Sequence, residues 1–293
     1  MSESKKIEKL KQRIKHWPGL FKCPICHELL VIRGGYQLQC RNNHNFDLSR
    51  KGYVNLLAGN AASSYNKMML ESRMKVAKAG LFDPLLNRIT TILTSRFTHL
   101  SILDAGCGEG SHLRYLINKI DSDNVTVKSI GLDNSKEGIQ LASRETSDII
   151  WCVGDIARLP LNSSRFTLVL NILSPANYRE FKRVLQDNGQ LLKVIPGSEH
   201  LKELRELFYP EKNQSTYNPP EVVEHAKKYF VNYTEDRLTN KNPISSDLVP
   251  HVVKMTPLSW RIPKTKQQQI AKMGLCDITT DYHILIGNLS KNN

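Results

Sequence analysis

Short apolar runs alternate with stretches of helical periodicity over residues 66–208 of the chain. Helices are predicted where apolar residues recur every three to four positions, over 66–80, 83–97, 177–185 and 200–208. Strands are predicted at the start of SILDAGCGEG and of VKSIGLDNSK, in IIWCVGDIARLPL up to about Asp155, and in RFTLVLNILSP and GQLLKVIPG. Strand and helix in alternation are typical of a parallel, doubly wound sheet, whose ligands bind beyond the carboxyl ends of the strands. We therefore predict an α/β, Rossmann-like fold for this region.

The chain on either side of this region follows other patterns. Near the N-terminus, Ile7, Leu10, Ile14 and Trp17 recur at helical spacing among lysines, which predicts a basic amphipathic helix. Such a helix suits RNA, a membrane surface or a partner helix, but we expect it to dock on its own domain. The stretch AGNAASSYN has the composition of a linker, and CDITTDYHILIGNL that of a last strand. The predicted parts are a basic extension over 1–19, a small domain over 20–57, a linker over 58–66 and a large domain over 67–293.

The charge of the chain adds a polyanion partner to this picture. The 293 residues include 41 Lys+Arg against 28 Asp+Glu, a formal net charge of +13. Contacts to phosphates release counterions, so this charge favours nucleic acid, although a lysine-rich proteome would give the same excess. No run approaches the roughly 20 apolar residues of a membrane span, and the six cysteines do not resemble a secreted disulfide framework. We expect a cytoplasmic protein with no membrane partner.

Cys23, Cys26, Cys40 and His44 have the spacing of a zinc site. A Cys-x-x-Cys turn places two thiolates on one side of a tetrahedral ion, and the second pair completes the coordination shell. Between the pairs, the apolar alternation of LLVIRGGYQLQ around its Gly-Gly dipeptide predicts a β-hairpin, as in a zinc ribbon. Four protein ligands close the shell, so the zinc is expected to be structural. The alternative is a set of ordinary buried thiols with a surface histidine.

The first predicted strand leads into a glycine-rich turn, DAGCGEG, after Asp104. Gly106, Gly108 and Gly110 permit close approach of the backbone to a ligand. The helix that starts near Ser111 points its N-terminus at the same place. The third glycine comes two residues after the second rather than three, which departs from the dinucleotide fingerprint and disfavours a nicotinamide-dependent enzyme. Glycine turns also serve tight packing, so the turn alone identifies no ligand.

Acidic residues after the next two strands point to S-adenosylmethionine as that ligand. Asp133 ends the second strand, where a carboxylate can accept hydrogen bonds from both ribose hydroxyls. Asp155 follows the third strand and is placed to reach the adenine amino group. The positive amino and sulfonium groups of this cofactor suit the acidic surroundings, to which Asp104 contributes. The alternative is that Asp133 and Asp155 each cap the N-terminus of a helix.

Taken together, the motifs resemble those of a known family, the methyltransferases that modify N1 of a guanine in large-subunit ribosomal RNA, of which one member is known for macrolide resistance. The likeness covers the chain from about Phe21 onward. It rests on the order and spacing of CPIC…C…HNFD, KGYVNLL, LDAGCGEG, GLDNSK, IPGSEHLKEL and MTPLSWR. The resemblance implies a class I methyltransferase domain behind a zinc-ribbon domain, with structural zinc on the ligands named above. It also implies cofactor contacts from the Gly106–Gly110 turn, Asp133, His200 and Phe82, where some members carry a tyrosine.

The function implied by the resemblance is methyl transfer from S-adenosylmethionine to guanine N1 in a hairpin of large-subunit ribosomal RNA, by a chain that can form homodimers. After the fourth strand, NILSP stands where many amino-methylating enzymes carry an Asn/Asp-Pro-Pro-aromatic motif. Here the aromatic is missing, although Tyr178 is nearby, and no residue is assigned as general base. The alternatives are a small-molecule methyltransferase, which has little use for the zinc ribbon, and a non-catalytic zinc-ribbon nucleic-acid-binding protein, which does not need the glycine turn.

Overall fold

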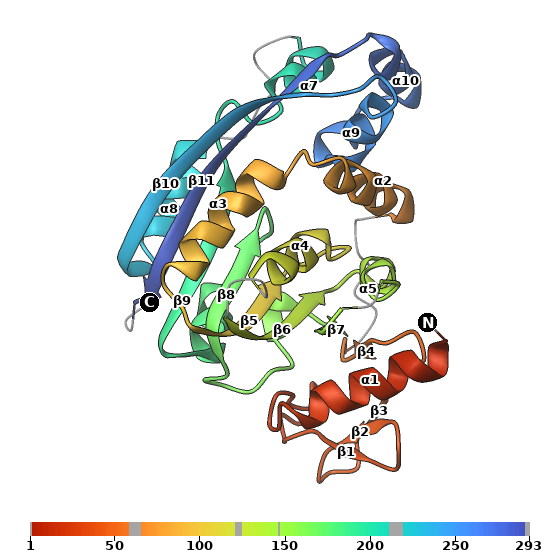
Figure 1. Ribbon diagram of the computed structural model, residues 1–293, viewed down its shortest axis with the longest axis vertical. Coiled ribbons are helices and arrows are strands. Elements are labelled where there is room, and N and C mark those ends of the chain that lie inside the picture. The colour runs from red at the N-terminus through yellow and green to blue at the C-terminus, as the bar shows by residue number, and fades with distance from the viewer. Residues whose placement is uncertain (1, 59–65, 121–124, 146, 211–218, 291–293) are drawn as a thin grey trace.

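The computed structural model describes residues 2–58, 66–120, 125–145, 147–210 and 219–290. At its centre lies an eight-stranded sheet with the strand order β10-β11-β9-β8-β5-β6-β7-β4 (Figure 1). These strands are β4 (Val54–Asn55), β5 (His99–Ala105), β6 (Thr126–Asp133), β7 (Ile149–Val153), β8 (Phe166–Ile172), β9 (Leu185–Pro196), β10 (Phe230–Pro243) and β11 (Asp277–Leu289). The strands from β9 to β4 are parallel, whereas β11 is antiparallel to both β9 and β10. The predicted doubly wound α/β fold is confirmed.

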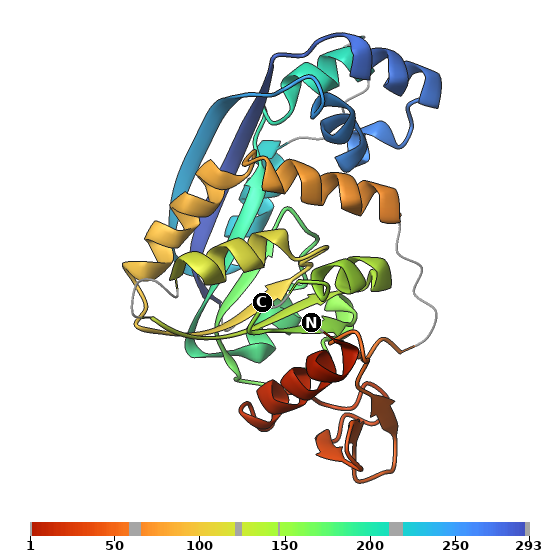
Figure 2. The same cartoon turned by 45° about the vertical axis from the view of Figure 1, so that its right-hand side comes forward.

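Helices cover both faces of the sheet because alternate residues of each strand point to opposite sides. On β5, Ile102 packs into one apolar core and Leu103 into the other. The first core is shared with α2 (Lys67–Lys78), α3 (Asp83–Thr94), α4 (Ser111–Ile120), α5 (Lys136–Ala142), α7 (Lys202–Phe208), α9 (Val249–Met255) and α10 (Lys264–Lys272). The second core is shared with α1 (Glu3–Lys15), α6 (Tyr178–Val184) and α8 (Pro219–Lys227). The turned view of Figure 2 shows helices on both sides of the strands.

The N-terminal part packs against the edge of the large sheet. Its own sheet has three short strands, β1 (Val31–Arg33), β2 (Gln37–Gln39) and β3 (Asn45–Asp47), with the predicted hairpin between the first two. Helix α1 buries the apolar stripe predicted from the sequence, and β4 pairs in parallel with β7. Most of the predicted linker, 59–65, lies outside the described residues. The basic helix is therefore docked on the rest of its own chain, as expected.

The C-terminal third contains elements that the sequence pattern did not predict. The predicted last strand is β11, which pairs along most of its length with β10. Strand β10 was not predicted because almost all of its residues are exposed or half-buried, so it lacks an apolar pattern. Helices α8, α9 and α10 were not predicted either. Within the described part of the chain, no helix is long and apolar enough to cross a membrane.

Candidate active site and zinc site

The predicted zinc ligands come together between two tight turns. The donor atoms of Cys23, Cys26, Cys40 and His44 all lie within 4.8 Å of one another. In the second turn, the Asn43 N–H donates to the Cys40 carbonyl at 3.0 Å, so that His44 faces the thiols. Burial raises the pKa of Cys23, whereas a backbone hydrogen bond lowers that of Cys26 to about 6. Three sulfurs and one imidazole in this arrangement fit a closed, tetrahedral zinc site.

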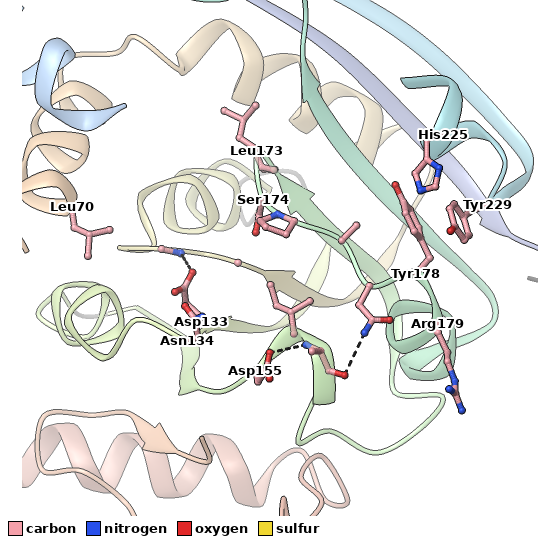
Figure 3. A pocket seen from close by; sticks show the side chains of 18 of the residues that line it. Leu70, Asp133, Asn134, Asp155, Leu173, Ser174, Tyr178, Arg179, His225 and Tyr229 are labelled. Atoms are coloured by element: carbon pink, nitrogen blue, oxygen red, sulfur yellow. Dashed lines mark hydrogen bonds between the residues drawn. The ribbon is translucent and has the colours of Figure 1, made fainter. Parts of the chain in front are cut away.

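A cavity of about 580 Å³ opens beyond the carboxyl ends of β5, β6, β7 and β8 (Figure 3). Loops after these strands form most of its wall, and α2 and the segment around α8 complete it. Of the predicted cofactor residues, Gly106, Gly108, Asp133 and Asp155 line this cavity. It lies where a doubly wound sheet binds its ligand.

The three glycines of the turn all have positive φ, but their surroundings differ. A Cβ on Gly108 would meet only the Arg73 guanidinium, at 3.7 Å, so the backbone there is open to the cavity. A Cβ on Gly106 would lie 1.9 Å from the Ser174 Oγ, and one on Gly110 would lie 2.5 Å from the Trp151 ring. Gly110 does not line the cavity, and its missing side chain makes room for a neighbour.

Asp133 joins the glycine turn to the next strand. Its carboxylate accepts one hydrogen bond from the Gly108 N–H at 2.9 Å and another from the Ser135 N–H at 2.8 Å. Ser135, rather than Asp133, caps α5 with its side chain. Burial raises the pKa of Asp133, and the two backbone donors lower it in part. The carboxylate is thus fixed beside the open backbone of Gly108, at the place predicted for the ribose.

Two further carboxyl groups lie buried beneath the turn. Asp104 and Glu109 are each only 2% exposed. Burial, and then the nearby Asp133 and Glu109, raise the pKa of Asp104 to about 8. Burial also raises the pKa of Glu109, against two hydrogen bonds from Ser111. Neither Asp104 nor Ser111 lines the cavity, so their predicted contacts to the cofactor stay a prediction.

Replacing Asp104 by asparagine should reduce the loss of stability that the protein shows as pH rises. The folded state keeps the Asp104 proton up to a pKa of about 8, whereas the unfolded chain releases it near pH 4. Stability therefore falls with rising pH across that window, by about 2 kcal/mol between pH 6 and 8. Urea unfolding at both pH values measures this difference. The exposed Asp187→Asn is the control, and an unchanged pH dependence in Asp104→Asn would contradict the assignment.

The structure is compatible with both roles predicted for Asp155, capping a helix and binding adenine. Its Oδ1 accepts the Ala157 N–H at 2.8 Å and so caps the short 3-10 helix Ile156–Arg158. The same residue lines the cavity. The cap orients the carboxylate at the mouth of the cavity, where it remains a candidate for adenine.

Phe82 and His200, the two positions implied only by the resemblance, do not line the cavity. Phe82 is 3% exposed and packs edge-on against His112, with 4.8 Å between ring centroids. The His200 Nδ1 accepts the Asp281 N–H at 3.3 Å, and its pKa is lowered to about 4, mainly by burial. Their contacts to the cofactor stay a prediction.

Several residues of the site were not predicted from the sequence. Arg73 on α2 lines the cavity, and its buried Nε has no hydrogen-bond partner among the described residues. His225 on α8 and Tyr229 just after it line the opposite end. No motif marks these positions, because they reach the cavity through packing of helices that lie far apart in the chain.

A buried network holds the loop after β8 at the cavity wall. The Asn171 Nδ2 donates to the carbonyls of Ala105 at 2.8 Å and Pro175 at 3.0 Å. The Lys193 Nζ donates to the Asn171 Oδ1 and to the Ser174 carbonyl, each at 2.5 Å. Burial lowers the pKa of Lys193 to about 8. The NILSP segment is thereby tied to the end of β5, directly before the glycine turn.

Two family models match the chain in the order that this architecture suggests. Residues 21–64 match the zinc ribbon described as RlmA, N-terminal. Residues 97–269 match a methyltransferase domain. The first match contains the zinc ligands, and the second contains the glycine turn and most of the cavity wall.

Curated relatives match over most of their length. A Bacillus subtilis (strain 168) protein provisionally named 23S rRNA (guanine-N(1)-)-methyltransferase YxjB is 38% identical over 92% of this chain and 97% of that protein. The Streptomyces fradiae 23S rRNA (guanine(748)-N(1))-methyltransferase is 28% identical over 88% of this chain and 92% of that protein. Since the first relative, the zinc ribbon and the methyltransferase domain all agree, the chain belongs to the family of 23S rRNA guanine-N1 methyltransferases.

Proposed function

We propose that the protein transfers a methyl group from S-adenosylmethionine to N1 of a guanine in a hairpin of large-subunit ribosomal RNA. The observation that carries this function is that one cavity has two chemically different ends. Its acidic end contains the open backbone of Gly108 beside Asp133, and its other end contains aromatic side chains. Cofactor and acceptor base therefore have adjoining places in one cavity.

The residues of the site act chiefly by orientation. When bound, S-adenosylmethionine supplies a methyl group on a positively charged sulfur, open to in-line attack. Transfer would break the S–C bond as the bond from guanine N1 forms, and the N1 proton would pass to solvent. Asp133 and the turn at Gly108 would hold the donor, and the loop held by Lys193 forms the cavity wall beside both reactants. Holding two reactants in line supplies much of such an acceleration. No general base is assigned.

The basic surface beside the cavity supports an RNA acceptor. A second hollow of about 360 Å³ lies on the other side of α2. Lys75, Lys78, Arg144 and Lys254 line it, with Glu71 as its acidic member. Clustered cations of this kind attract phosphates regardless of sequence.

The homodimer implied by the resemblance stays a prediction.

A methyl-transfer assay tests the function. Purified protein is incubated with labelled S-adenosylmethionine and large-subunit RNA that lacks its natural modifications, and the product is mapped by mass spectrometry. We expect one methyl group on N1 of a single hairpin guanine. Cofactor binding without transfer to RNA would instead favour a small-molecule acceptor.

A further inference from the structure

The end of the cavity away from Asp133 is built from two stacked tyrosines. The rings of Tyr178 and Tyr229 lie 8° from parallel with 4.0 Å between their centroids. His225 packs edge-on against Tyr229 at 5.4 Å. All three residues line the cavity, and in Figure 3 Tyr178 stands between Ser174 and Tyr229. Because Tyr229 covers one face of Tyr178, the other face is turned toward the loop of Ser174.

The pair is held rigidly from two sides. Tyr178 begins α6, whose N-cap Asn177 accepts the Glu180 N–H at 3.1 Å. Phe181, fully buried, contacts Tyr178 edge-on at 6.4 Å. The Tyr229 carbonyl accepts the Ser290 N–H at 2.8 Å, which ties it to the chain just after β11. A platform assembled in advance costs little conformational entropy when a ligand binds.

The chemistry of this end suits a flat, uncharged ring. Burial, and then Tyr229, raise the pKa of Tyr178 to about 12, so its hydroxyl keeps its proton at neutral pH. Asp133 lines the other end, beside the glycine turn, and Asp104 and Glu109 are buried and do not line the cavity. A neutral aromatic surface attracts nucleobases through stacking, whichever base is presented.

We propose that Tyr178, backed by Tyr229, is the platform on which the acceptor guanine lies once it has left its RNA stack. This inference rests on the proposed function, because it assigns a place to the acceptor of that reaction. A guanine in a hairpin must be splayed out before an enzyme can reach its N1 edge. Tyr178 supplies the stacking surface that NILSP lacks, and it lines the same cavity as Ser174, Gly108 and Asp133.

Substitutions at Tyr178 test the platform. Tyr178→Leu removes the ring, and Tyr178→Phe keeps it; Tyr233→Leu, on exposed strand β10, is the matched control. Single-turnover methyl transfer to the RNA is measured together with the dissociation constant for S-adenosylmethionine. We expect Tyr178→Leu to lower the rate constant about 10- to 100-fold. Cofactor affinity should stay within about 2-fold, Tyr178→Phe should retain most of the rate, and Tyr233→Leu should match the wild type.

Binding of guanosine monophosphate, followed by broadening of its H8 resonance, separates this inference from the proposed function. In the presence of S-adenosylhomocysteine, the product left by the cofactor, wild type should bind the nucleotide and Tyr178→Leu should not. If wild type methylates RNA but Tyr178→Leu keeps its rate and its nucleotide binding, the platform is wrong. If wild type methylates no RNA, the proposed function is wrong. In that case, nucleotide binding that is lost in Tyr178→Leu would still support the stacking platform. Nucleotide binding that is the same in Tyr178→Leu and wild type would overturn the platform. If Tyr178→Leu shows no thermal unfolding transition and so does not fold, Tyr229→Leu is tested in its place, because it removes the ring that backs Tyr178.

Discussion

Replacing Cys40 by serine should remove the zinc and abolish RNA methylation while S-adenosylmethionine still binds. The three-stranded sheet around the zinc has strands of only three residues each. Strands this short do not hold a fold without the metal that joins their turns. We therefore expect the ribbon to unfold locally and the rate of RNA methylation to fall more than about 100-fold.

Cofactor binding should survive because the cavity has no wall in the ribbon. Among its described lining residues, the first in sequence is Leu70 on α2. The ribbon is joined to the large sheet through the bridge between Phe21 and Leu161 and through the pairing of β4 with β7. Asn55 of β4 pairs with Val153, the cross-strand partner of Asp133, but β6 and β7 are held by their own pairing and by both apolar cores of the large domain.

Three measurements check this prediction: zinc content by mass spectrometry, cofactor affinity by calorimetry and methyl transfer to RNA. Cys276→Ser is the matched control, because Cys276 is exposed and lies outside the ribbon. It should change none of the three. Equal loss of cofactor binding in Cys40→Ser would mean that the zinc unit supports the fold of the large domain rather than the RNA.

Replacing Asp133 by asparagine should weaken S-adenosylmethionine binding about 100-fold and leave zinc content unchanged. The carboxylate already accepts the Gly108 and Ser135 N–H groups, and because Asp133 lines the cavity it can accept further hydrogen bonds from a ligand there. Both ribose hydroxyls can donate to a carboxylate, whereas an amide nitrogen cannot accept. Hydrogen bonds to a charged group contribute about 1.5 to 3 kcal/mol each, so losing one or two gives an effect of this size.

Asp155→Asn is the control for this substitution, since it also lines the cavity but caps a 3-10 helix. Asparagine caps a helix about as well as aspartate, so the expected change in affinity is below about 10-fold. Calorimetric titration with S-adenosylmethionine measures both variants. A larger loss in Asp155→Asn than in Asp133→Asn would move the main cofactor anchor from the second strand to the third.

Local spacing predicted the parts of this protein that lie close together in the chain. The ligands Cys23, Cys26, Cys40 and His44 were predicted because tight turns alone bring each pair together, and the structure confirms their convergence. The strands before and after the glycine turn were predicted because a buried parallel strand is apolar throughout. Family membership, first a resemblance of ordered motifs, is confirmed by relatives that match over most of the chain.

The structure distinguishes the glycines of the turn in a way that the sequence did not. All three glycines have positive φ, but only Gly106 and Gly108 line the cavity, and Gly110 accommodates Trp151. Whether a glycine faces a ligand or a neighbouring ring depends on what packs against it. That neighbour comes from another strand, which local spacing does not specify.

The sequence by itself determined the zinc ligands, the glycine turn and Asp133, because each follows from residues joined by one turn or one strand end. Tertiary structure alone decided that Tyr229 stacks on Tyr178, that Arg73 reaches the cavity and that β4 joins β7. It also decided the raised pKa of Asp104, which depends on burial. These features are contacts between segments far apart in the chain, and they exist only when the whole sheet and both of its cores have packed.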